Sequence, residues 1–249
     1  MSGLMRLPLL SITTKTMTKF KGYVLQRTSS PIDGKPLVII MTMKSANRKT
    51  DNMCQIWILR EDVNPVAAVE SGADLSMCGW CSHRKQDDGS RSCYVNPGQA
   101  PLAVWESYHR GIYGELDDLT PDLLQDREVR FGAFGDPAMM NPVIARWIVD
   151  NCKAHTGYTH QWKREFADWT KGLFMASCDH FQDYLDASSL GWKCFSVIPK
   201  GTTAKHIGKL CPTEATNSQA TCKTCKLCDG AKTDVFIPAH GRGAKYVKF

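Results

Sequence analysis

Seven of the eleven cysteines fall into two groups whose spacing suits metal binding. The C-terminal group has one upstream cysteine followed by a C-x2-C-x2-C run: Cys211, Cys222, Cys225 and Cys228. Cysteines two residues apart around a tight loop can direct their sulfurs at one point, and the bacterial ferredoxin run begins with the same spacing. We expect these four thiolates to bind a [4Fe-4S] cluster. Zinc is the alternative, because four thiolates also make a closed zinc site.

The earlier group has three cysteines in a C-x2-C-x11-C spacing, namely Cys78, Cys81 and Cys93. Three thiolates leave one position of a tetrahedral ion, or one corner of a cubane cluster, without a cysteine. His83 is a candidate for that position, which could also stay open for a substrate or cofactor. The other interpretation is that Cys78 and Cys93 are buried as small apolar residues. Both interpretations stay open for this group.

The remaining four cysteines lie in apolar runs and are predicted to belong to the core: Cys54, Cys152, Cys178 and Cys194. Disulfides are not expected, because the chain shows no secretory signal and the cysteine spacing fits metal sites better. Several lysines near the C-terminal group should place positive charge beside its thiolates: Lys205 or Lys209, Lys223 and Lys226. Such charge would offset the negative charge of a cluster and raise its reduction potential.

Short β-branched runs alternate with helical patterns along most of the chain. Strands are predicted at residues 37–43, 55–59, 129–134, 157–162, 173–178, 193–198 and 234–240. Helices are predicted at residues 62–71, 100–111, 141–155, 163–172 and 180–191. This alternation is typical of βαβ units around a parallel sheet. Units of roughly 20 to 30 residues favour an α/β fold with a (β/α) barrel, partial or complete. Its cysteine-bearing loops would cover about residues 75–95 and 208–232.

Polar side chains follow the predicted strands at their carboxyl ends: Asp136, His160, Gln161, Asp179 and His240. Parallel barrels and doubly wound sheets build their active sites at that edge. We therefore expect these residues at the mouth of a site, with Asp136, His160 and Asp179 as catalytic candidates. They would serve in acid–base chemistry, substrate contacts or hydrogen bonds to a cluster. The alternatives are a turn role for Asp136 before Pro137 and helix N-capping by Asp179.

The composition bounds the class of protein. The chain has 249 residues, of which 43% are hydrophobic and 22% charged, as in ordinary globular domains. We expect a single domain over residues 35–249, preceded by an N-terminal arm or leader strands over residues 1–34. No apolar run approaches the roughly eighteen residues of a membrane span, and the N-terminal run lacks a signal cleavage site. A cytoplasmic protein without membrane contact is expected.

Several reaction classes are excluded by missing motifs. The sequence has no Gly-x-Gly-x-x-Gly, Walker A or HExxH motif, which excludes dinucleotide, P-loop and zincin sites. No two histidines lie two residues apart, so the metal motif of a rolling-circle nuclease is absent. The net charge of +6 permits contact with nucleic acid, but no basic and aromatic stripe indicates it.

Taken together, the motifs resemble those of a known family. In chain order they are CYV, FGAFGDP, TGYTHQW, ASCD, GWKCFSVIP, the C-x2-C-x2-C loop and IPAHG. Over roughly residues 75–241 the chain resembles bacteriophage proteins related to the gene-product-88 proteins of mycobacteriophages. The resemblance implies a barrel similar to the radical S-adenosylmethionine core, carrying an iron–sulfur cluster, in the cytoplasm of an infected host. The chain lacks the C-x3-C-x2-C signature of the radical enzymes, so cleavage of S-adenosylmethionine is not carried over.

Two functions from different classes follow. The first is an iron–sulfur protein with redox or radical-type catalysis on a small-molecule or macromolecular substrate. The second is a nucleic-acid-binding, replication-associated factor in which zinc or a cluster has a structural role. The identity of the bound metal separates a zinc-stabilised protein from an iron–sulfur protein.

Overall fold

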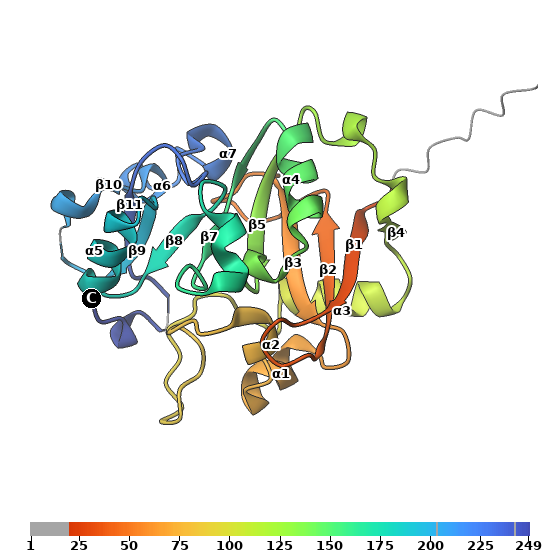
Figure 1. Cartoon of the computed structure of the whole chain (residues 1–249), viewed down its shortest axis with the longest axis horizontal. Coiled ribbons are helices and arrows are strands. Elements are labelled where there is room, and N and C mark those ends of the chain that lie inside the picture. Colours follow the sequence, from red (N-terminus) through yellow and green to blue (C-terminus); the bar gives the residue numbers. More distant parts are fainter. Residues whose placement is uncertain (1–19, 203, 242) are drawn as a thin grey trace, which may run out of the picture.

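The computed structural model describes residues 20–202, 204–241 and 243–249. Within these ranges the fold is α/β, with two mostly parallel sheets (Figure 1), so the predicted class is confirmed at that level. Neither sheet closes on itself among the described residues, and the complete form of the predicted barrel is not observed. Most of the predicted N-terminal arm, residues 1–19, lies outside the described residues. Residues 22–29 form a strand of the first sheet.

The first sheet has six strands in the order β4-β1-β2-β3-β5-β6. Its strands are β1 (Gly22–Ser29), β2 (Pro36–Thr42), β3 (Cys54–Arg60), β4 (Gly114–Glu115), β5 (Glu128–Phe134) and β6 (Ala154–Thr156). Strands β1, β2 and β3 form an antiparallel meander, whereas β3, β5 and β6 run parallel. Every residue of β3 is buried, as expected for a strand covered on both faces.

The second sheet has five parallel strands in the order β10-β11-β9-β8-β7. Its strands are β7 (Tyr158–Thr159), β8 (Met175–Cys178), β9 (Cys194–Ile198), β10 (Lys209–Leu210) and β11 (Val235–Pro238). One residue, Gly157, separates β6 from β7 and so joins the two sheets. A Cβ atom on Gly157 would lie 2.5 Å from the Phe174 ring, so the junction has no room for a side chain. The predicted strand 157–162 is therefore shortened to two residues.

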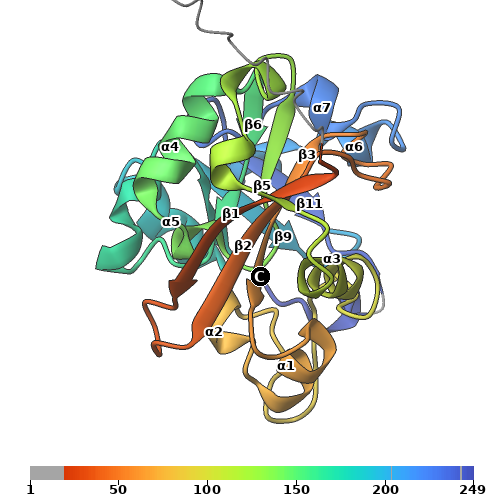
Figure 2. The ribbon, with the colours of Figure 1, turned by 90° about the vertical axis from the view of Figure 1, so that its right-hand side faces the viewer.

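Helices cover both faces of the first sheet. The α-helices are α1 (Pro65–Ser71), α2 (Leu75–Cys78), α3 (Ala100–His109), α4 (Pro142–Asn151), α5 (Phe181–Ser189), α6 (Pro212–Ala215) and α7 (Cys222–Cys225). The 3-10 helices are η1 (Leu116–Asp118), η2 (Pro121–Leu123), η3 (Pro137–Met139), η4 (Glu165–Thr170), η5 (Lys205–Ile207) and η6 (Ala244–Tyr246). Figure 2 shows α4 on one side of the first sheet and α3 on the opposite side.

Helix starts follow from local capping. Asn141 caps α4 as predicted, because its side chain accepts the Val143 N–H at 2.8 Å. The helix ends at Asn151, earlier than predicted, since residues 154–156 pair with β5 instead. Helix α1 is capped by Asn64 and not by Asp62, whose carboxylate pairs with Arg60 at 2.8 Å. The predicted helix 163–172 is reduced to the short 3-10 helix η4.

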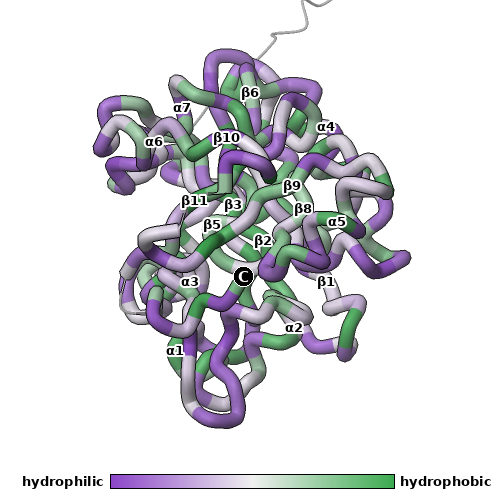
Figure 3. The backbone as a smooth tube through the Cα atoms, turned by 90° about the vertical axis from the view of Figure 1, so that its left-hand side faces the viewer, coloured by the Kyte–Doolittle hydropathy of each residue, from purple (hydrophilic) through white to green (hydrophobic). Residues whose placement is uncertain are grey.

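The hydrophobic core lies along the strands, while the outer loops are hydrophilic (Figure 3). Three of the cysteines predicted to be core residues are fully buried: Cys54, Cys178 and Cys194. Cys152 is partly buried and packs against the main cluster. Across the described residues, no helix combines the length and the apolar character needed to cross a membrane.

Candidate functional site

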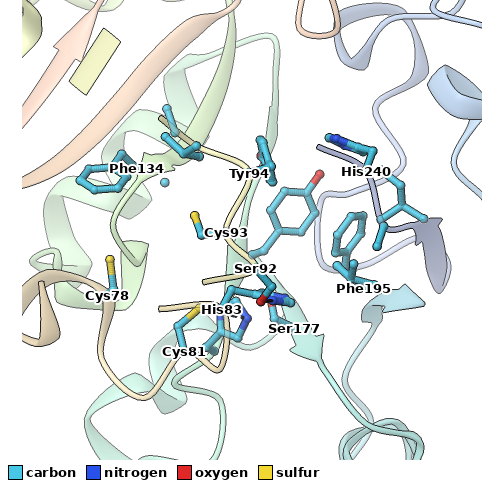
Figure 4. A pocket seen from close by; sticks show the side chains of 18 of the residues that line it. Cys78, Cys81, His83, Ser92, Cys93, Tyr94, Phe134, Ser177, Phe195 and His240 are labelled. Atoms are coloured by element: carbon cyan, nitrogen blue, oxygen red, sulfur yellow. Dashed lines mark hydrogen bonds between the residues drawn. The ribbon is translucent and has the colours of Figure 1, made fainter. Parts of the chain in front are cut away.

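A cavity of about 230 Å³ lies where the carboxyl ends of the parallel strands meet the cysteine loops. We call residues 78–93 the early cysteine loop and residues 211–228 the late cysteine loop. Five cysteines from the two loops line this cavity: Cys78, Cys81, Cys93, Cys211 and Cys222. Figure 4 shows the early thiols on one side of the cavity and His240 on the other. The two cysteine groups, distant in the sequence, therefore face one space.

The early cysteine loop is held by Gln161, which follows β7. Its Nε2 donates to the Cys78 carbonyl at 3.1 Å, and its Oε1 accepts the Trp80 N–H at 3.2 Å. Gly79 lies between these contacts with φ of 59°, and a Cβ there would be 2.3 Å from the Gln161 amide carbon. Only glycine permits this approach and this backbone conformation. Gln161, predicted at the site mouth, thus fixes the turn between Cys78 and Cys81.

Two of the three early thiols, those of Cys78 and Cys93, have their pKa raised by their surroundings. Burial raises the pKa of the Cys78 thiol well above its ordinary value, and the nearby Asp74 and the other two thiols raise it further. Burial also raises the pKa of Cys93. Such thiols keep their protons until a cation stabilises the thiolates. All three line the cavity and are only partly buried, so none is a purely internal core residue.

Asp179, directly after β8, gathers two histidines and a serine. Its Oδ1 lies 3.1 Å from His83 Nε2 and 3.3 Å from His160 Nε2, and its Oδ2 accepts the Ser82 hydroxyl at 2.6 Å. The Cys81 sulfur lies 3.6 Å from the same His160 nitrogen. The structure thus brings together His160 and Asp179, both predicted site residues, and adds His83 from the early cysteine loop.

These contacts determine the charge states of the His160 imidazole and the Asp179 carboxylate. Burial disfavours the imidazolium of His160, but Cys81 and Asp179 raise its pKa well above the ordinary value. Burial likewise disfavours the Asp179 carboxylate, yet His160 and His83 hold its pKa well below the ordinary value. The alternative prediction that Asp179 caps a helix is wrong, because α5 begins after His180, which makes no side-chain capping bond. Asp179 turns into the site instead of toward the helix.

Asp136, separated from the end of β5 by Gly135, accepts hydrogen bonds within the protein at both carboxylate oxygens. Oδ1 accepts the Ala138 N–H at 3.0 Å, and Oδ2 accepts the His160 N–H at 2.8 Å and the Gln161 side-chain amide at 3.2 Å. Its own N–H donates to the Met77 carbonyl at 2.7 Å. Burial raises the pKa of Asp136. The predicted turn role applies, and these bonds make Asp136 the residue that ties β5, β7 and α2 together beneath the cavity.

His240, the last predicted site residue, lies across the cavity from the other histidines. Its Nε2 is 3.2 Å from Lys49 Nζ, and its ring centroid is 5.3 Å from that of Tyr94. Lys49 also forms an ion pair with Glu214. Burial and the Lys49 charge lower the pKa of His240. His240 is therefore a neutral group on the side of the late cysteine loop.

The late cysteine loop is shaped by two very short helices. Thr221 caps α7 through a reciprocal bond with Thr224, and Lys226 then adopts a left-handed conformation with φ of 55°. This reversal returns the chain toward the sheet, where the Cys228 carbonyl accepts the Gly157 N–H at 3.0 Å. The Cys211 N–H is bonded to the Phe236 carbonyl of β11 at 2.9 Å. The loop is therefore fastened to the second sheet at both ends.

The four late thiols lie within electrostatic reach of one another. Burial raises the pKa of Cys222 and Cys225, and it raises that of Cys228 to about 12. The value for Cys228 also includes a lowering by the neighbouring Tyr158 hydroxyl and a rise from the charges of the other three thiols. In the part of the chain that the structure describes, the cysteine sulfurs do not form a group of three within 4.8 Å.

Arg130 is a site residue that the sequence prediction missed. It lies on β5, lines the cavity and donates from Nη2 to the Tyr94 hydroxyl at 2.6 Å. Burial disfavours its charge, but Tyr94, Tyr158 and Cys222 raise its pKa. The available signal was a single arginine inside an otherwise apolar strand, VRFGAF, because such a charge must find partners in the interior.

Two of the lysines expected beside the late thiolates pair with carboxylates. Lys226 Nζ lies 3.4 Å from Glu128, and Lys223 Nζ lies 3.8 Å from Asp51. Arg130 lines the cavity, and its charge opposes the rise that burial causes in the pKa of Cys222.

A scan against protein-family models, a search of curated proteins and a search of solved structures each gave no match. The function is therefore inferred from the geometry of the site.

Proposed function

We propose that this protein is an iron–sulfur protein that holds a [4Fe-4S] cluster on the late cysteine loop, beside a substrate cavity. The ligands would be Cys211, Cys222, Cys225 and Cys228. The observation that carries the proposal is that the four thiols lie within electrostatic reach of one another, and that two of them, Cys211 and Cys222, line a cavity whose other wall bears polar groups from the strand ends. A bound cluster would supply one-electron redox chemistry at this wall.

The sequence spacing of the late cysteines favours a cluster over a single zinc ion. Three cysteines in a C-x2-C-x2-C run match the start of the bacterial ferredoxin run, in which each thiolate binds a separate iron. A zinc site more often pairs one C-x2-C turn with a second, distant one. The fourth thiolate, from Cys211, completes a donor set that suits a cubane.

The residues of this chain would bind and orient a substrate at that wall. Arg130 keeps its positive charge in a partly buried position between Tyr94 and Cys222. A cation there attracts an anionic group of a substrate and also offsets the charge of the thiolates. Tyr158 and Phe195, whose ring centroids are 4.3 Å apart, supply an apolar surface beside it. We therefore propose a small anionic substrate and redox or radical-type chemistry.

The family resemblance and the finer fold belong to the same proposal. Parallel neighbours follow chain order in both sheets: β3, β5 and β6 in the first, and β7, β8, β9 and β11 in the second. This order supports an open (β/α) barrel. The motifs that suggested kinship with the bacteriophage proteins follow β5, β7, β8 and β11, and so meet at one edge. In this interpretation the protein works in the reducing cytoplasm of an infected host, where thiolates persist.

The test is anaerobic purification followed by analysis of iron, sulfide and zinc. We expect a brown protein that absorbs broadly near about 400 nm and holds about four irons and four sulfides per chain. Cys225→Ser should lose this chromophore, whereas Cys152→Ser should keep it, because the Cys152 thiol bonds to the Val149 and Ala154 carbonyls and does not line the cavity. A colourless protein with stoichiometric zinc and no sulfide would contradict the proposal. It would favour the nucleic-acid-binding factor with a structural metal.

A further inference from the structure

Three side chains from separate segments meet at the cavity wall under the early cysteine loop. His83 belongs to that loop, His160 follows β7, and Asp179 follows β8. One ligand atom from each lies within 4.8 Å of the other two, which no other set of histidine, cysteine or acidic side chains achieves among the described residues. All three line the cavity. The cluster is therefore accessible to a small ligand and not sealed in the core.

The contacts do not form a Cys-His-Asp catalytic relay. Such a relay needs the nucleophile and the carboxylate on opposite nitrogens of the imidazole. Here the Cys81 sulfur at 3.6 Å and the Asp179 oxygen at 3.3 Å approach the same nitrogen, Nε2 of His160. His83 also directs its Nε2 at the same Asp179 oxygen, at 3.1 Å. Two nitrogens thus approach one oxygen, and the three atoms lie within 4.8 Å of one another, as the ligand atoms of a metal ion do.

The distances match a coordination sphere. Ligands bound at about 2.0–2.1 Å in tetrahedral geometry lie about 3.3 Å apart. The two nitrogen-to-oxygen distances are 3.1 and 3.3 Å. Two histidines and one carboxylate leave positions open, as in catalytic zinc sites and in non-haem iron sites.

Two of the three side chains, His83 and Asp179, are oriented by a further hydrogen bond, and the backbone of His160 is held beside them. His83 Nδ1 is 2.8 Å from the Ser92 hydroxyl, and Asp179 Oδ2 accepts the Ser82 hydroxyl at 2.6 Å. The backbone N–H of His160 donates to Asp136 at 2.8 Å. Metal-binding histidines and carboxylates are commonly held by such outer bonds, which fix the ring and the tautomer.

We propose that His83, His160 and Asp179 bind one divalent transition-metal ion, with an open coordination position facing the cavity. The ion would act as a Lewis acid on an oxygen of the bound substrate or on a water molecule. The site shares no ligand with the four late cysteines, so it stands independently of the proposed cluster. It also assigns His83 to this ion and not to the early cysteine group.

Cobalt(II) titration of the full-length protein under anaerobic conditions tests the site. The protein is first dialysed against a chelator, and binding is followed by visible absorption. A nitrogen and oxygen site gives weak ligand-field bands, whereas cysteine sites give intense thiolate bands, so the two can be counted separately. We expect one ligand-field site per chain. Asp179→Asn and His160→Gln should weaken it at least about 100-fold, and Ser92→Ala about 10-fold, in line with the loss of a ligand or its outer partner.

Matched controls keep the result interpretable. His180→Gln and Asp183→Asn change the same residue types next to the site and should bind cobalt as the unaltered protein does. Cys81→Ser should retain the ligand-field bands, and circular dichroism should show that each variant is folded. If Asp179→Asn unfolds, His83→Gln tests the same ligand set. Folded Asp179→Asn or His83→Gln protein with unaltered cobalt binding overturns the proposal, as does loss of the bands in Cys81→Ser.

Discussion

The two cysteine loops face the same cavity but differ in what surrounds their thiols. The late cysteine loop has four cysteines and no histidine, and its neighbours are Tyr158 and Arg130. The early cysteine loop has three cysteines and also His83, which lies beside His160 and Asp179. A complete thiolate set can hold a cluster without other ligands, whereas an incomplete set beside nitrogen and oxygen donors leaves coordination positions open. In the proposed function, the late loop would serve electron transfer and the early loop contact with substrate.

The strongest way to break this comparison is to remove one thiolate from each loop. Cys225→Ser should lose nearly all cluster iron and sulfide, because four thiolates are needed to hold a cubane firmly. Cys78→Ser should keep about four irons per chain, since its thiol belongs to the other loop. Iron and sulfide analysis of both purified proteins measures the difference. Equal iron loss in both variants would show that the loops share a single cluster.

A second test loosens the early loop without touching its thiols. Gly79→Ala places a methyl group against Gln161, at a backbone conformation with φ of 59°. Gly89→Ala also has a positive φ, of 79°, but its Cβ meets no atom within 4 Å. Gly79 also has ψ of −144°, a conformation that essentially only glycine adopts, so backbone strain and the collision together should make Gly79→Ala about 1–3 kcal/mol less stable than Gly89→Ala. Urea unfolding measures both. Equal losses of stability would mean that Gln161 does not clamp the loop.

Arg130 offers a test confined to the late loop. Arg130→Met should lower the reduction potential of the cluster, because the lost positive charge no longer stabilises the reduced form. Each 1.4 kcal/mol of lost attraction corresponds to about 60 mV for a one-electron couple. Lys223→Met should shift the potential less, since Lys223 lies 3.8 Å from the Asp51 carboxylate, outside the cavity. A redox titration monitored by visible absorption compares them, and an unchanged potential in Arg130→Met would remove the arginine from the cluster environment.

The smallest expected effect is a change in stability at the first sheet, away from the thiols of both loops. Burial lowers the pKa of His155 on β6, although its ring bonds to the Leu173 carbonyl at 2.8 Å. The unfolded chain therefore binds this proton more readily, so the free energy of unfolding should fall as the pH drops below about 6.5. The slope is less than about 1.4 kcal/mol per pH unit. His155→Gln should flatten it in urea unfolding at pH 7.5 and 5.5, without changing metal content. If the free energy of unfolding depended more steeply on pH in His155→Gln than in the unaltered protein, the pKa of His155 would be raised by folding and not lowered.

Much of the frame was predictable because its signals are local. The apolar run at residues 37–43 and the run at 129–134 became β2 and β5, and Asn141 with Pro142 marked the start of α4. The ends of elements were less predictable where a distant partner decides. Residues 154–156 continue a helical pattern, yet their backbone pairs with β5.

In the candidate site, too, local sequence signals were predictive and distant contacts were not. Spacing alone identified the cysteine groups, and placement at strand ends identified His160 and Asp179. The orientation of Asp179 was not predictable, because Ser82 and His83 reach it from a loop almost a hundred residues earlier. Arg130 was missed for a related reason. Its partners Tyr94 and Tyr158 lie on other segments, so its burial cannot be judged from the strand in which it occurs.

The hydrogen bond between Gly157 and Cys228 connects the proposed cluster site to the junction of the two sheets. Gly157 is the residue at which one sheet gives way to the other, and its N–H is held by the carbonyl of a proposed cluster ligand at 3.0 Å. Oxidative damage at Cys228 would therefore act on the seam of the fold as well as on electron transfer. We expect a protein that has been exposed to air to become more susceptible to proteolysis near the junction of the two sheets. Loss of the cluster absorption and loss of folded structure should therefore occur together.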